Sequence, residues 1–286
     1  MANLPLNPMA TTNAAGSFGV QSDGFIQGVA LDDPANRFNL ASGTVAATET
    51  KPLWGGLPVA ELLPGVNSSP RGSTIRRAVS LAELEGFTVF NQAHNGLTTP
   101  QSPVPLYASG MSVSFYRLGS NMRVPLKASA QVVALGAAGA SVKTPLAWDF
   151  VNNQVTTAAA AAFAGANIAT TAVTYSNGVA TATTASAHGL TAGQYVKISG
   201  VAPAAYNGTV VVLTVPTATT FTYAPASAPG GSATTQGTIG AVAQADITLP
   251  VKVISIESGN SKTVNYDSAT GFLTWNNTDS CALVLL

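Results

Sequence analysis

His94 and His188 are the only imidazole groups in the chain, and imidazole is the side chain best suited to acid–base catalysis near neutral pH. Such catalysis also needs neighbouring charged groups that tune the pKa of the acid or base. The chain has few of them, because only 8% of its 286 residues are charged, and no Gly-x-Ser-x-Gly nucleophile pattern occurs. We therefore predict no catalytic residue and no enzymatic activity; a hydrolase assembled from residues distant in sequence is the alternative. We expect His94 to cap a turn and His188 to close a loop through a ring nitrogen bonded to a backbone carbonyl.

Metal and cofactor sites lack the residue spacing that they need. The single cysteine, Cys281, allows neither an intrachain disulfide nor a multi-cysteine zinc site. The pair Asp32 and Asp33 could contact a hard cation, but paired acidic residues in a loop more often cap a helix or face solvent. The glycine-rich stretch at 136–139 lacks the lysine of a phosphate-binding loop. We predict no metal and no cofactor.

Arg71, Arg76 and Arg77 form the one basic cluster of the sequence. Arginine makes bidentate bonds to carboxylates, so this cluster could contact an acidic surface of a partner protein. A solvent-exposed loop is the alternative interpretation, because isolated surface charges contribute little. We include the three arginines in a predicted partner interface.

Aromatic residues are the second candidates for that interface. Trp54 lies in a loop-like segment beside Leu53, and Phe18 lies in another such segment, so we predict that all three contact a partner. Packing of Trp54 within its own chain is the alternative. Trp148 and Trp275 lie on predicted hairpin strands, where core packing is expected; a sugar-binding platform built from the tryptophans is the competing hypothesis.

The overall composition restricts the class of partner. Lys+Arg and Asp+Glu number 12 each, which gives a net charge of zero and argues against direct nucleic-acid binding. A hydrophobic content of 46% is enough to form a core, and a nearly uncharged surface favours association between copies. No apolar run is long enough to span a membrane, and residues 1–8 do not resemble a secretion signal. We expect a soluble homo-oligomer synthesised in the cytoplasm.

Residues 166–240 are predicted to form a separate, charge-poor β domain. Between positions 151 and 240 the only charged residue is Lys197, and β-branched residues and turn formers dominate. Asn177-Gly178 is typical of a type I′ hairpin turn. Alanine-rich residues 156–164 are expected to form a linker, with a short helix as the alternative. The predicted strands are 172–175, 179–183, 195–198, 210–215 and 220–223.

The segments on either side of this domain are predicted to form one discontinuous β domain, residues 71–165 plus 241–286. A strand-turn-strand pattern around Trp148-Asp149 is repeated around Tyr266-Asp267, which suggests similar hairpins flanking an insertion. A capping box at Ser80 and Glu83 predicts a short helix ending at Gly86. Residues 1–70 are expected to form an extended arm. The other predicted strands are 87–90, 111–117, 122–126, 131–135, 247–256 and 281–286. The fold class is therefore all-β: a discontinuous barrel or sandwich with an inserted immunoglobulin-like or small-barrel domain.

Two stretches resemble structural proteins of tailed bacteriophages. The segments AHGLTAGQYVKISG at 187–200, YNGT at 206–209 and TTFTY at 219–223 are similar to a small β module of phage virion proteins. The segments KPLWGG at 51–56 and VNYDSATGFLTW at 264–275 more loosely resemble capsid decoration, or cement, proteins. The module occurs in heads and tails alike.

The resemblance implies a virion protein that binds the capsid exterior and stabilises the mature shell, with the major capsid protein and further copies of itself, as a dimer or trimer, as partners. It implies no catalytic residues and no contact with nucleic acid or membrane. A tail tube, baseplate or fibre component is the first alternative, and a glycan-binding module is the second.

Overall fold

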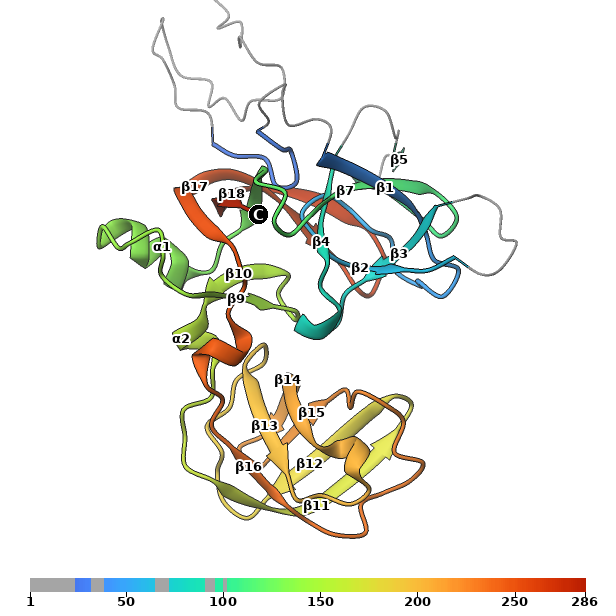
Figure 1. Ribbon diagram of the computed structural model, residues 1–286, viewed down its shortest axis with the longest axis vertical. Coiled ribbons are helices and arrows are strands. Elements are labelled where there is room, and N and C mark those ends of the chain that lie inside the picture. The colour runs from blue at the N-terminus through green and yellow to red at the C-terminus, as the bar shows by residue number, and fades with distance from the viewer. Residues whose placement is uncertain (1–23, 32–38, 65–71, 91–95, 100–101) are drawn as a thin grey trace, which may run out of the picture. The chain divides into compact units, whose positions relative to one another are not determined.

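The computed structural model describes residues 24–31, 39–64, 72–90, 96–99 and 102–286, and it is nearly all β, as predicted. The chain divides into two compact units. Unit 1 comprises Met1–Thr144 and Pro250–Leu286, and unit 2 comprises Pro145–Leu249. A discontinuous domain interrupted by an inserted one is therefore present (Figure 1).

Unit 1 contains a closed five-stranded barrel and a three-stranded sheet. Around the barrel the strands are β1 (Leu40–Val45), β3 (Ser73–Arg77), β2 (Pro58–Leu62), β4 (Gly86–Val89) and β7 (Ser112–Arg117). Strands β1 and β3 are parallel, and the other neighbours are antiparallel. The three-stranded sheet consists of β17 (Lys252–Tyr266), β18 (Leu273–Leu285) and β8 (Arg123–Lys127). A small hairpin is formed by β5 (Leu97–Thr99) and β6 (Ser102–Leu106).

The core of unit 1 draws residues from the segment that was expected to be an arm. Leu53, Trp54 and Leu57 are buried together with Ile75 and Phe115. Strands β1 and β2 also fall within residues 1–70, so the arm prediction is wrong for 40–62. The physical reason is that a barrel can bury isolated apolar residues of loop-like segments, which show no strand periodicity of their own. Residues 1–23 of the expected arm lie outside the described residues.

A helix replaces one predicted strand of unit 1. Residues 131–135 lie within α1 (Ala130–Ala137). The Ser129 side chain accepts a hydrogen bond from the Val132 N–H at 3.4 Å, as a helix cap does. Ala, Gln and Leu favour helix, and only Val132 in α1 is buried, so the apolar run did not require a pleated strand.

The short helix predicted from the capping box is a single 3₁₀ turn, η2 (Leu81–Glu83). The Ser80 side chain makes no capping hydrogen bond. Gly86 does not end a helix but begins β4, where a Cβ atom would come within 2.1 Å of the Tyr116 carbonyl oxygen. A glycine is required there because two backbones approach closely.

Unit 2 contains a closed six-stranded barrel. Of the two predicted alternatives, an immunoglobulin-like fold or a small barrel, the barrel is therefore found. Around it the strands are β11 (Ile168–Ser176), β12 (Val179–Thr184), β15 (Thr220–Tyr223), β14 (Gly208–Thr217), β13 (Tyr195–Ser199) and β16 (Thr238–Gly240). All five strands predicted in this region are present. Asn177 (φ 49°) and Gly178 (φ 84°) both have positive φ angles, as the predicted hairpin turn requires.

Unit 2 is longer at both ends than the predicted inserted domain, residues 166–240. It also contains β9 (Leu146–Asp149), β10 (Gln154–Thr157), α2 (Ala158–Ala161) and the 3₁₀ turns η3 (Ala204–Tyr206) and η4 (Gln244–Ile247). The Tyr195 hydroxyl donates to the Trp148 carbonyl at 2.6 Å, and the Leu249 N–H donates to the Leu146 carbonyl at 2.7 Å. These bonds join the β9–β10 hairpin to unit 2.

The alanine-rich stretch expected to be a linker is ordered secondary structure. Its helix, α2, begins after Thr157, whose hydroxyl accepts the Ala160 N–H at 3.2 Å. The helical alternative is therefore confirmed. Within the described part of the chain, no helix has the length and apolar character needed to cross a lipid bilayer.

Candidate functional site

Trp54 and Leu53, two predicted interface residues, are core residues of unit 1. Trp54 is 2% exposed and stacks on Tyr266, with ring centroids 5.5 Å apart. Leu53 is fully buried and exchanges two backbone hydrogen bonds with Tyr107. The prediction that these two side chains are exposed to a partner is wrong, because the barrel core covers them, and the alternative of packing within the chain is confirmed.

The two described arginines of the basic cluster are engaged within unit 1. The Arg77 guanidinium lies over the Trp54 ring at 4.8 Å and donates to the Pro52 carbonyl at 2.9 Å. Burial lowers the pKa of Arg77, and the nearby Glu49 carboxylate opposes that shift. Arg76 forms an ion pair with Glu83 at 2.8 Å. Neither arginine is presented as a free cation, and Arg71 and Phe18 lie outside the described residues.

His188 closes a loop of unit 2, as predicted, but with the opposite hydrogen-bond polarity. It is 4% exposed, and its Nδ1 accepts the Leu190 N–H at 3.0 Å instead of bonding a carbonyl. Its ring packs edge-on against Phe221 at 5.5 Å. The Nε2 atom has no hydrogen-bond partner among the described residues. This environment makes His188 a packing residue; His94, Asp32 and Asp33 lie outside the described part.

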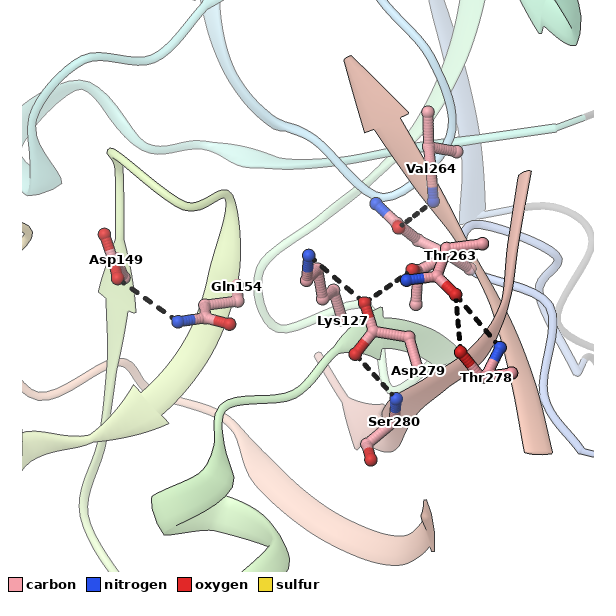
Figure 2. Close-up of polar contacts among 10 residues, drawn as sticks. Lys127, Asp149, Gln154, Thr263, Val264, Thr278, Asp279 and Ser280 are labelled. Carbon is pink, nitrogen blue, oxygen red and sulfur yellow. Dashed lines mark hydrogen bonds and ion pairs between the residues drawn. The ribbon is translucent and has the colours of Figure 1, made fainter. Parts of the chain in front are cut away.

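A polar cluster in unit 1 ties three strands together (Figure 2). The Asp279 carboxylate accepts from the Thr263 hydroxyl at 2.8 Å and from the Ser280 N–H at 3.0 Å, and it lies 3.2 Å from Lys127 Nζ. Burial opposes ionisation of Asp279, but these hydrogen bonds and the Lys127 charge together lower its pKa. The cluster therefore cross-links β8, β17 and β18.

Cys281 lies two residues beyond Asp279 on β18 and is buried. Burial raises the pKa of its thiol to about 12. A thiol with that pKa is protonated at neutral pH and a poor nucleophile. No group of three or more His, Cys, Asp or Glu side chains in the described ranges could hold a metal ion.

Threonines on four neighbouring strands of unit 2, β11, β12, β15 and β14, form a row across the surface of the barrel. Thr174 pairs with Thr181 across β11 and β12, Thr181 pairs with Thr222 across β12 and β15, and Thr222 pairs with Thr214 across β15 and β14. All four are exposed or half-buried. The hydroxyls of Thr214 and Thr222 are 2.7 Å apart.

A second, shorter row runs beside the first. Thr183 pairs with Thr220, and Thr220 pairs with Thr217, whose hydroxyl lies 2.7 Å from that of Thr220. We call these seven residues the threonine face: Thr174, Thr181, Thr183, Thr214, Thr217, Thr220 and Thr222. None of the four strands that form it carries a charged residue.

The residues that alternate with the threonine face form the barrel core. Ala180, Ala182, Phe221 and Tyr223 are completely buried. The period-2 alternation was visible in the sequence, for example in VATATT and TFTY, but the strand order that brings the threonines into rows was not. The face was therefore not predicted, although its strands were.

The tryptophans do not form an exposed platform for a sugar. Trp54 and Trp148 are buried, and Trp275 is half-buried, with its ring 5.9 Å from that of Phe90. Core packing of Trp148 is confirmed. Comparisons of the chain with protein-family models, curated protein sequences and solved structures found no match.

Proposed function

We propose that this chain is a structural protein of a tailed-phage virion that binds the outside of the capsid and stabilises the mature shell. The threonine face is the observation that carries the proposal, together with the sequence resemblance described above. It offers methyl and hydroxyl groups and no charge, on a barrel with its own cluster of buried apolar residues. Such a surface suits contact with another protein.

The physical basis of the proposed binding is that contacts between uncharged groups depend only weakly on salt concentration. Burial of methyl groups contributes about 25 cal/mol per Å² of apolar area, and it is not screened by ions as charge pairs are. Threonine hydroxyls can bond to backbone groups of a partner, and β-branched side chains lose little conformational freedom when they are covered. A neutral face also brings no like-charge repulsion when many copies lie close together on a shell.

Stabilisation of the shell would follow from mass action. A protein that binds the mature lattice, and not its dissociated subunits, stabilises that lattice in proportion to RT ln(1 + [L]/Kd) at each site. Binding by a dimer or trimer would add the effect of multivalency. The proposed partners are therefore the major capsid protein and further copies of this chain.

Co-sedimentation with capsids tests the proposal. Purified protein is mixed with expanded, undecorated capsids at low and high salt, and the sedimented particles are imaged. We expect saturable binding on the shell exterior that persists at high salt. Absence of binding by folded protein at saturating concentration would reject the capsid assignment, and binding to purified tails instead would support the tail alternative.

A matched pair of variants tests the role of the threonine face. Thr181→Lys places a charge in the middle of the face, whereas Thr191→Lys adds the same charge to an exposed loop of unit 2. We expect capsid affinity to fall at least tenfold for Thr181→Lys and to change less than twofold for Thr191→Lys, with both proteins folded by circular dichroism. Equal affinities would show that the face does not contact the shell.

A further inference from the structure

Strand β17 lies at one edge of the three-stranded sheet of unit 1. On its inner side it pairs with β18. On its outer side Ile26 forms a parallel bridge with Lys262, in the C-terminal half of the strand. Residues 252–257 have no bridge or strand on that side within the described part of the chain, and we call them the open edge (β17 in Figure 1). Such an edge presents backbone N–H and C=O groups to which a further strand can pair.

The open edge carries opposite charges at its two ends. Lys252 is exposed at one end, and Glu257 is half-buried at the other. Neither side chain forms an ion pair with another of the residues that the structure describes. When two identical strands pair antiparallel, the start of one lies opposite the end of the other, so each Lys252 would face Glu257 of a second copy. Opposite charges in cross-strand positions stabilise the pairing of strands.

A β-bulge places the two charged side chains on the same face of the strand. Lys252 and Glu257 are five residues apart, and an odd separation in a regular strand puts side chains on opposite faces. The pairing with β18 shifts between Val253 and Ser255, where β17 has one extra residue. The residues of β18 opposite Lys252 and Glu257 are therefore only four apart, and an even separation means the same face. The bulge thus allows both charges to meet their counterparts across an antiparallel pair.

We propose that the open edge pairs antiparallel with the open edge of a second copy, about a two-fold axis between Ile254 and Ser255. This pairing joins two three-stranded sheets into one and brings Ile254, which is 46% exposed in the single chain, close to the axis. Ile256 keeps its contact with Gly136 of α1, because the strands meet through their backbones. A net charge of zero leaves no overall repulsion between copies. The inference rests on the self-association in the proposed function and gives it an interface.

Sedimentation of the purified full-length protein over a hundredfold range of concentration tests this interface. We expect the unaltered protein to change from monomer to dimer. Lys252→Glu and Glu257→Lys each place like charges opposite one another at both ends of the open edge, and each should weaken dimerisation at least about tenfold. The double variant Lys252→Glu/Glu257→Lys restores opposite charges and should dimerise like the unaltered protein. Lys143→Glu makes the same change at an exposed position elsewhere in unit 1 and is the matched control, with no expected effect.

Several outcomes would overturn the proposal. A protein that stays monomeric at every concentration would show that the open edges do not pair, and a trimer is incompatible with two-fold pairing. A dimer that persists in both single variants, or that the double variant does not restore, would show that the copies meet elsewhere. Slow hydrogen exchange of residues 252–257 in the dilute monomer would show that another segment of the same chain covers the edge. These measurements contain no capsid, so their result is independent of the capsid-binding test.

Discussion

Tyr195 shows how one polar group is accommodated in a barrel that has almost no charge. Its side chain is buried, and its hydroxyl donates to the Trp148 carbonyl at 2.6 Å within unit 2. Burial raises the pKa of Tyr195 far above its ordinary value. The hydroxyl is therefore protonated at neutral pH and able to donate this hydrogen bond.

Removal of this hydroxyl should destabilise unit 2. In Tyr195→Phe, the Trp148 carbonyl loses a partner in a buried setting, which costs about 1–2 kcal/mol of unfolding free energy. Urea unfolding measures the change. Tyr175→Phe, at a partly buried position, is the control and should change stability by less than about 0.5 kcal/mol. Similar effects of both variants would argue against the hydrogen bond.

The lowered pKa of Asp279 predicts that the stability of unit 1 depends on pH. Its pKa in the folded protein lies below the ordinary value of 3.8, so the ionised carboxylate stabilises the fold above that value. The contribution is lost as the pH falls through the lowered pKa. We expect Asp279→Asn to be about 1–2 kcal/mol less stable than the unaltered protein at pH 7, with the difference shrinking below about pH 4.

Urea unfolding at pH values from 7 down to 2 checks this expectation. Asp246→Asn, at an exposed position, is the control for removal of a carboxylate and should change stability at pH 7 by less than about 0.5 kcal/mol. A stability difference for Asp279→Asn that stays constant across the series would contradict a role of ionisation.

At the scale of elements, close backbone contact between β4 and β7 limits what the barrel of unit 1 tolerates. Gly86→Ala would bring a Cβ atom within 2.1 Å of the Tyr116 carbonyl oxygen, so the strands must separate. We expect a loss of at least about 2 kcal/mol in thermal or urea unfolding. Gly231→Ala, where nothing lies within 4 Å of the added atom, is the control and should be close to neutral.

The strands that could be predicted are those whose pattern is local. In unit 2, alternation in VATATT and TFTY and the Asn177-Gly178 turn define strands and a hairpin without reference to the rest of the chain. The hairpins after Trp148 and Tyr266 were also predicted, and their similarity has a local cause. Asp149 and Asp267 each accept the N–H two residues later at 2.9 Å, which fixes the turn.

The features that could not be predicted depend on residues distant in sequence. The sequence of α1 is apolar enough for a strand, and only Val132 of this segment is buried in the folded chain, so a helix with one buried residue forms instead. Trp54 is covered by Tyr266, near the other end of the sequence, and by Arg77 at the end of β3. The threonine face depends on β12 lying between β11 and β15. Strand order and tertiary burial cannot be predicted from any one short segment of the sequence.

At the scale of the whole molecule, unit 2 should fold by itself. It is continuous in sequence, has its own buried cluster and has its own closed barrel. We expect the isolated fragment 145–249 to unfold cooperatively with heat and to show a β-type circular dichroism spectrum. A fragment without a cooperative transition would show that unit 2 needs the rest of the chain.

The pairing of β8 with β18 determines the order in which the two units can fold during translation. Leu126 lies opposite Ala282, so β8 leaves the ribosome long before its neighbour has been translated. The core of unit 1 also needs Val264 and Leu273. All of 145–249 is translated before these residues, and its contacts can form in the meantime. During translation, unit 2 can therefore fold before unit 1. Unit 1 can complete its sheet and its core only after the C-terminal residues have been translated.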